Sequence, residues 1–172
     1  MDCTKNKMWS VSFPILPASL EALQHLPEAD LHEPWHTAAL TVAALCVYPQ
    51  NKNTSIEMLN YLKGPQPLSP YEIQFLADRL RGRDYLPASF FAGASPENEY
   101  IPTIPYTVVI LENPASYMQQ SEGYVQLFIQ SGGADSPRPV KLRYKASSKQ
   151  WFLWEQMLLS EIRPPETTDP WV

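Results

Sequence analysis

The sequence predicts an α+β fold, in which an N-terminal layer of short helices packs on a C-terminal antiparallel meander of about four strands. Three observations lead to this prediction. Helical periodicity dominates the first half of the chain, alternation of apolar and polar residues dominates residues 106–156, and the connections between the expected strands are too short for parallel crossovers. The same order of elements also fits an alternative, a cone-like α+β fold with a pocket between the helices and a curved sheet.

A strand and two helices are expected before residue 50. Residues 9–15 alternate as in a half-buried strand, which could extend the meander, and Pro14 favours a place at the sheet edge. Residues 17–27 form a short amphipathic pattern bounded by prolines. Residues 34–48 have no polar face, so we expect this helix to be covered on most sides and to form the centre of the domain.

Two further helices are expected to start at capping boxes, in which a hydroxyl and a carboxylate satisfy backbone amides of the first turn. Residues 54–57 have this pattern, and so do residues 69–72. The first of these helices should end at Gly64 and the second near Gly82, because glycine readily adopts the left-handed conformation that closes a helix.

Residues 83–105 form an aromatic, proline-rich stretch without periodicity. A structureless loop of this length is uncommon in a compact domain, and disordered segments are poor in aromatic residues. We therefore expect the stretch to be ordered and to line whatever site the protein has. Phe90 and Phe91 are adjacent, so in an extended chain one ring should anchor to the core and the other should face a groove or a partner.

Four strands are expected over residues 106–111, 124–130, 138–145 and 150–156. The third strand alternates strictly between an apolar row, which should face the core, and a basic row, which should face solvent or a partner. The apolar row is Val140, Leu142 and Tyr144, and the basic row is Lys141, Arg143 and Lys145.

No repeat and no linker divides the chain, so a single domain is expected over residues 1–172. Its parts are a helical region over about 17–82, the aromatic loop over about 83–105, a β region over about 106–156 and an extended tail over 157–172. Trp171 in the tail is expected to dock on the body of the domain because large aromatic side chains gain free energy from burial.

Composition and charge exclude several classes of protein. With 44% hydrophobic residues among 172, the chain is not intrinsically disordered. A net charge of -5 disfavours nucleic acid as the main partner, and the longest apolar run, residues 38–48, is far shorter than the roughly 18 residues of a membrane span. Cys3 and Cys46 have no metal or redox spacing, and no signal-peptide pattern is found. We therefore expect no membrane partner and a cytoplasmic location.

Six segments carry a specific combination of residues. They are residues 36–45, 58–60 with 63–69, 74–76 with 78–79, 131–143, 150–155 and 169–171. Together they resemble a family of uncharacterised bacterial proteins, a domain of unknown function, over most of residues 30–172. The resemblance implies a small intracellular bacterial protein, and it supplies no activity, ligand or catalytic residue.

Three histidines raise the question of a metal site. His32 and His36 are four residues apart, a spacing at which two imidazoles on one helical face could bind zinc, and His25 is nearby. Pro34 lies between them, which places His32 before the helix and removes the shared face. Because no third ligand is evident, we expect no metal, although the sequence leaves binding by these histidines open.

Two other patterns allow a functional interpretation beside a structural one. Residues 131–135 could cradle an anion with their backbone amides, but a hairpin loop is favoured because a strand, not a helix, follows. The basic row, extended by Arg138 and Lys149, could bind a single-stranded nucleic acid beside the tryptophans of the last strand, but a solvated sheet face is favoured. We find no catalytic constellation, and we expect no cofactor.

We expect a non-enzymatic interaction module that contacts another protein or a second copy of itself, because low charge and surplus aromatics leave apolar surface to cover. The alternative is a small-molecule-binding protein or an enzyme, with its site between residues 83–105 and the sheet. The candidate ligand-binding or partner-binding residues are Tyr85, Phe90, Phe91, Tyr100, Arg138, Lys141 and Arg143.

Overall fold

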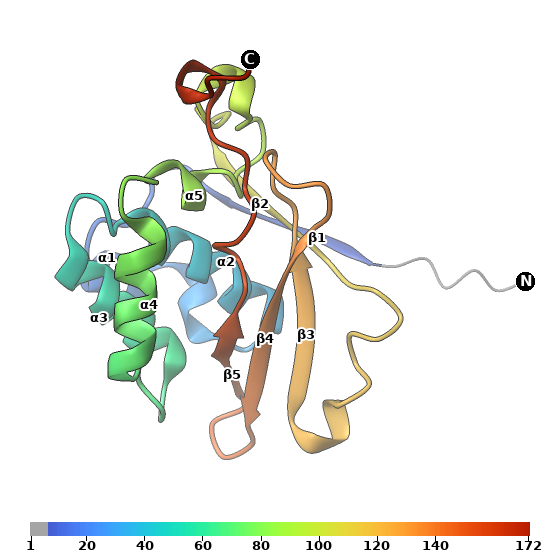
Figure 1. Ribbon diagram of the computed structural model, residues 1–172. Helices are drawn as coiled ribbons and strands as arrows, with labels where there is room; N and C mark the ends of the chain where they lie inside the picture. Colours follow the sequence, from blue (N-terminus) through green and yellow to red (C-terminus); the bar gives the residue numbers. More distant parts are fainter. Residues whose placement is uncertain (1–6) are drawn as a thin grey trace, which may run out of the picture.

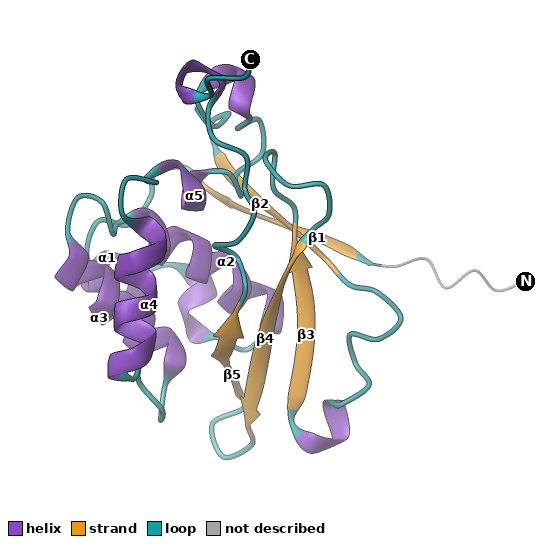
Figure 2. Cartoon of the chain, viewed as in Figure 1, coloured by secondary structure: helices purple, strands orange, loops and turns teal. Residues whose placement is uncertain are grey.

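The computed structural model describes residues 7–172, and its architecture is α+β, with most helices before most strands (Figures 1 and 2). The helices are α1 (Leu20–Gln24), α2 (Pro34–Cys46), α3 (Lys52–Lys63), α4 (Pro70–Leu80) and α5 (Tyr85–Ala88). The strands are β1 (Met8–Phe13), β2 (Tyr106–Leu111), β3 (Tyr124–Ile129), β4 (Arg138–Lys145) and β5 (Gln150–Gln156). Short 3-10 helices are η1 (Pro27–Asp30), η2 (Pro96–Asn98), η3 (Gln120–Glu122) and η4 (Glu166–Thr168). Cys3 lies outside the described residues.

The five strands form one antiparallel sheet in the order β1-β2-β3-β4-β5. The N-terminal strand therefore extends the predicted meander, and it forms an edge, as Pro14 suggested. β2 and β3 pair over two positions only, so β1 and β2 cross the direction of β3–β5 in Figure 1. Beyond this short contact, Phe91 of the aromatic loop forms an antiparallel bridge with Val108 of β2.

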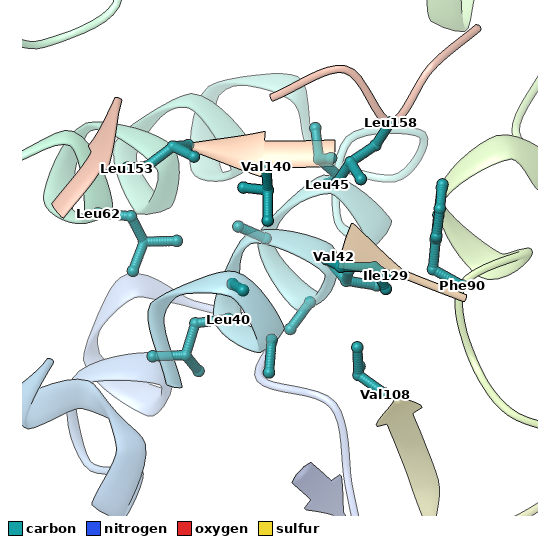
Figure 3. Packing of buried hydrophobic residues seen from close by; sticks show 14 of the residues in the cluster. Leu40, Val42, Leu45, Leu62, Phe90, Val108, Ile129, Val140, Leu153 and Leu158 are labelled. Carbon is teal, nitrogen blue, oxygen red and sulfur yellow. The ribbon is translucent and has the colours of Figure 1, made fainter. Parts of the chain in front are cut away.

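The helix α2 is the central element of the core, as its lack of a polar face predicted. It contacts all five strands, and its residues from Thr37 to Leu45 are fully buried. Figure 3 shows this helix among side chains of the sheet and of the aromatic loop. Thr41 donates to the carbonyl of Thr37, and the Thr37 hydroxyl donates to the carbonyl of Trp151, so both buried hydroxyls have partners.

The edge strand β5 is closed by groups from the helical layer. The Trp151 N–H donates to the Leu31 carbonyl at 2.7 Å, and Lys63 Nζ donates to the Trp154 carbonyl at 3.0 Å. An uncovered edge strand exposes backbone donors and acceptors that can pair with other chains. These bonds, with the one from Thr37, therefore protect this edge and hold the helices against the sheet.

The predicted capping box is present at the start of α4 but not at the start of α3. α4 begins with the predicted capping box, in which Ser69 accepts the Glu72 N–H and the Glu72 carboxylate accepts the Ser69 N–H. The prediction for α3 is wrong, because the helix begins earlier and Asn51 caps it by accepting the Thr54 N–H. Asparagine is at least as good a cap as threonine, and it comes three residues earlier in the chain.

Two aromatic residues are more exposed than the sequence predicted. Tyr144 is 37% exposed because it lies at the hairpin end of β4, where its ring contacts Trp151. Trp171 is 93% exposed, so the expectation that it docks on the body is wrong. The tail is held at Arg163, whose N–H donates to the Gly133 carbonyl, and the prolines after it carry the chain to η2, beyond the sheet.

Candidate functional site

The aromatic loop is ordered and is fastened to the tail. It contains α5 and η2, and the rings of Tyr85 and Tyr100 stack with their centroids 5.4 Å apart. The Tyr100 hydroxyl donates to the Arg163 carbonyl. Burial raises the pKa of Tyr100 to about 12, although the nearby charge of Arg163 opposes this rise. The two tyrosines therefore join residues 83–105 to the tail.

Phe90 and Phe91 are both buried, with 1% and 2% of their surface exposed. Neither ring is exposed on the surface, so the two side chains do not divide between the core and an open surface as an extended backbone would require; the backbone here is turned. The Phe90 N–H donates to the Pro87 carbonyl and the Phe91 N–H to the Ala88 carbonyl, so successive side chains need not point to opposite sides. Both rings pack into the core that α2 organises.

A cleft of about 380 Å³ opens between residues 90–94 of the aromatic loop and residues 130–137, which connect β3 to β4. Close packing of the two loops forms it. The Gly132 N–H donates to the Ser89 carbonyl at 2.9 Å, and a Cβ atom on Gly132 would collide with the Ala94 carbonyl. The cleft lies where the sequence placed the site of the alternative function.

The lining of this cleft is chemically simple. The residues that line it include Phe90 and Phe91, the serines Ser131 and Ser136, and one residue with a carboxylate. That carboxylate, Asp135, is paired with Arg163 at 2.7 Å. The lining includes no histidine, cysteine or lysine, and its one carboxylate is held by Arg163. Its groups suit the binding of a small polar molecule.

Arg138 holds the tail rather than facing a free surface. Its guanidinium donates to the carbonyls of Ser160 and Glu161 at 3.1 and 3.0 Å and to the Ser136 carbonyl at 2.9 Å. These bonds tie β4 to the tail where the tail leaves the sheet. Arg138 therefore does not belong to the same surface as Lys141 and Arg143, the two other candidate residues of this strand.

Lys141 and Arg143 lie against two aromatic rings on the outer face of the sheet, the face turned away from α2. The Arg143 guanidinium carbon lies 4.7 Å from the ring centroid of Trp154 and 5.3 Å from that of Tyr124. Lys141 Nζ lies 4.9 Å from the Tyr124 centroid, and the two rings meet edge to face at 5.6 Å. We call this surface the cationic–aromatic face. It consists of Tyr124, Lys141, Arg143, Lys145 and Trp154.

Strand register creates this arrangement. Tyr124 pairs directly with Arg143, so both side chains leave the sheet on the same side. Lys141 pairs with Glu155 while Leu142 pairs with Leu153, so Trp154 has no partner in β4 and joins the outer face at a bulge. Tyr124 was not among the candidates from the sequence, although the buried Val125 beside it already indicated that it points outward.

The cations of this face form no ion pair with a carboxylate of the described residues, although Glu155, the register partner of Lys141, leaves the sheet on the same side. Among residues 7–172, the ion pairs of 4.0 Å or shorter involve Lys63, Arg81, Arg163 and two histidines, and none involves Lys141, Arg143 or Lys145. Lys145 instead donates to the Ser147 hydroxyl. A chain with a net charge of -5 therefore presents a local surface of the opposite sign.

A pocket of about 300 Å³ adjoins this face beside the connection from α3 to α4. Its charged side consists of Arg143 and Lys145, which have no carboxylate partner among the described residues, and of Lys63, which is paired with Glu72; its apolar groups include Phe152, Trp154 and Pro65. We call it the outer pocket. An apolar wall beside two cations suits an apolar group that carries, or lies next to, a negative charge.

The three histidines do not gather around a common centre. His25 Nδ1 bonds its own helix at the Glu21 carbonyl, and the Nδ1 atoms of His32 and His36 lie 3.5 and 4.0 Å from the Asp30 carboxylate. In the described chain, no three histidine, cysteine, aspartate or glutamate side chains come close enough to share a metal ion. No helix within residues 7–172 has the length and apolar character needed to cross a membrane.

A family model of a domain of unknown function, DUF6935, matches residues 15–166. The chain belongs to this family. The match covers all five helices and the strands β2–β5, and it starts earlier than the resemblance seen in the sequence alone. No protein with a curated description and no solved structure matches the chain.

Membership of this family assigns no activity to the protein. The chemical groups on the surface of the protein are the remaining guide to what it does. The cleft offers backbone and hydroxyl groups, and the cationic–aromatic face offers fixed positive charge beside aromatic rings.

Proposed function

We propose that this protein is a non-enzymatic interaction module that binds an acidic segment of a protein partner on its cationic–aromatic face. One observation carries the proposal. The Arg143 guanidinium lies over Tyr124 and Trp154, and no carboxylate of the described residues lies within ion-pair distance of it. An unneutralised cation that the protein itself holds in place is prepared for an anion from elsewhere.

The composition of the face supports a protein partner. Tryptophan, tyrosine and arginine are the residue types that carry most of the binding energy at protein interfaces. Here all three meet at one point on a rigid sheet, so little side-chain freedom remains to be lost on binding. Acidic side chains of a partner would add charge-assisted hydrogen bonds to the arginine.

The same contacts disfavour a nucleic acid. Sequence-tolerant binding of single strands relies on bases that stack on open aromatic faces. Here Arg143 covers Tyr124 and Trp154, and Lys141 also lies over Tyr124. The net charge of -5 would further oppose a polyanion at longer range.

Selection of peptides tests the proposal. Random peptides displayed on phage are selected on the immobilised protein, and the affinity of synthetic winners is measured by calorimetry. We expect winners rich in aspartate, glutamate and aromatic residues. The Arg143→Glu variant should bind them about thirty-fold more weakly, the effect of losing one interface hot spot.

A matched control exists on α4. Arg79 lies over the Phe75 ring at 5.1 Å, so Arg79→Glu makes the same charge change at another arginine–aromatic contact and should leave binding unchanged. Winners without acidic residues, or equal losses in the two variants, would contradict the proposal. If single-stranded DNA binds more tightly than any peptide, and its affinity falls steeply with salt, the partner is a nucleic acid and not a protein.

The cleft between the two loops supports a second candidate function, binding of a small polar molecule. Its volume of about 380 Å³ lies within the range of ligand sites, roughly 300–1,000 Å³. Ala92 is exposed and lines the cleft, so Ala92→Trp should fill it without disturbing the core. A metabolite that raises the melting temperature of the wild type and of the hairpin control Ala146→Trp, but not of Ala92→Trp, would support this function. A stabilisation that persists in Ala92→Trp would exclude the cleft as the site.

A further inference from the structure

The tail carries an aromatic side chain that is not buried against any of residues 7–172. Trp171 is 93% exposed, whereas a tryptophan can bury roughly 150–250 Å² of surface when it finds one. Glu166 and Asp169 lie close to it in the chain, and neither forms an ion pair within residues 7–172. The one nearby cation, Arg163, is already paired with Asp135. The tail is therefore an acidic segment with an unburied indole.

The outer pocket has the complementary chemistry. Its apolar groups include Phe152 and Trp154, and Arg143 and Lys145 stand beside them without carboxylate partners. At about 300 Å³ it is at the small end of ligand sites, which suits one large side chain. An indole that enters it would place neighbouring carboxylates near the two cations.

The tail cannot reach this pocket on its own molecule. In Figure 1 the C-terminal end and the β4–β5 hairpin lie at opposite ends of the molecule. η4 contacts η2 at the far end, and the three residues from there to Trp171 span at most about 11 Å. Arg143 lies five residues along β4 from the tail-bound Arg138, which alone is about 16 Å of strand. A tail that occupies the pocket must therefore come from another molecule.

We propose that the partner bound by the cationic–aromatic face is the tail of a second copy of this chain. Trp171 of one copy enters the outer pocket of the next, and Glu166 and Asp169 face Arg143 and Lys145. This inference rests on the proposed function and names its partner. Each copy contributes one tail and one pocket, so the contact either closes as a two-fold dimer that exchanges tails or continues into larger rings or chains.

Two variants and their mixture test the arrangement by sedimentation velocity. Trp171→Ala keeps the pocket and loses the indole, and the double variant Arg143→Glu, Lys145→Glu keeps the tail and loses the cations. We expect the wild type to assemble with rising concentration, more weakly at high salt, and each variant to stay monomeric. A mixture of the two variants should form a dimer and nothing larger, because it contains one intact tail and one intact pocket.

The mixture also serves as the control for folding, since a misfolded variant could not restore the contact. A wild type that stays monomeric at every concentration would overturn the inference. So would a Trp171→Ala protein that assembles like the wild type, or a mixture that stays monomeric although the wild type assembles.

A labelled peptide of residues 164–172 separates this inference from the proposed function. We expect it to bind the Trp171→Ala protein, and to bind the Arg143→Glu, Lys145→Glu protein about thirty-fold more weakly. If the peptide does not bind while acidic peptides from phage selection still bind at Arg143, the tail is not the partner and the proposed function stands. If neither the tail peptide nor acidic peptides from phage selection bind, both this inference and the proposed function are wrong.

Discussion

At the scale of single residues, one ion pair joins three elements of the fold. Lys63 Nζ lies 3.0 Å from a Glu72 carboxylate oxygen and 3.0 Å from the Trp154 carbonyl. The other oxygen of Glu72 accepts the Ser69 N–H at the start of α4. The carboxylate thus connects the start of α4 to the end of α3, and the lysine connects both to β5. Lys63 is buried, which restricts the access of water to this contact.

Protonation of Glu72 should therefore weaken the fold. Burial by itself raises the pKa of this carboxyl, but hydrogen bonds from Ser69 and Lys63 outweigh it and lower the pKa below its ordinary value. A lowered folded-state pKa means that the stabilisation is present above the unfolded-state pKa of about 4.3 and is lost as the pH falls through the folded-state pKa. We expect Glu72→Gln to be less stable than the wild type at neutral pH, with a difference that shrinks in acid.

Urea unfolding over a series of pH values measures this difference. Glu57→Gln, on the exposed side of α3, is the control and should stay close to the wild type in stability throughout. A gap between Glu72→Gln and the wild type that keeps its size from neutral pH to acid would show that the carboxylate charge does not stabilise the fold.

At the scale of elements, local signals predicted well where no competing signal stood nearby. α2 was predicted from its apolar surface, and α4 from the box formed by Ser69 and Glu72, because both signals act within a few residues. The start of α3 was not predicted correctly, because Asn51 and Thr54 are both acceptable caps. The N-cap preferences of asparagine and threonine differ too little for the local sequence to decide between them.

The structure of the aromatic loop could be predicted only in part from local sequence. Its order was predictable from its aromatic content, but the burial of both Phe90 and Phe91 was not. Their positions depend on turns that begin in α5 and on the bridge from Phe91 to Val108, a contact between segments that are distant in sequence. Periodicity reports only on residues that share one regular element.

At the scale of the whole molecule, the candidate face was partly visible in the sequence. Alternation along β4 placed Lys141 and Arg143 outward, and the structure agrees. Which rings would lie against Arg143 depended on the register of three strands and on the bulge that turns Trp154 outward. Register arises from pairing between strands and cannot be read from any one of them.

The position of α2 predicts that the helices and the sheet unfold together. This helix contacts all five strands and three other helical elements, and Ala43 in its middle is fully buried. A carboxylate at Ala43 would be buried without a partner, so Ala43→Asp should cost several kcal/mol, on the order of the largest single-residue effects. Because one core serves both layers, the loss should appear in both at once.

Two probes of urea unfolding test this last prediction. Far-ultraviolet circular dichroism follows mainly the helices, and tryptophan fluorescence follows Trp9, Trp151 and Trp154 in the sheet together with Trp35 at the start of α2. We expect the two transitions to coincide in the wild type and to move together to lower urea in Ala43→Asp, while Ala22→Asp on the exposed side of α1 moves neither. Two separate transitions, or a shift of one probe alone, would mean that residues 7–172 contain two folding units, and that α2 belongs to only one of them.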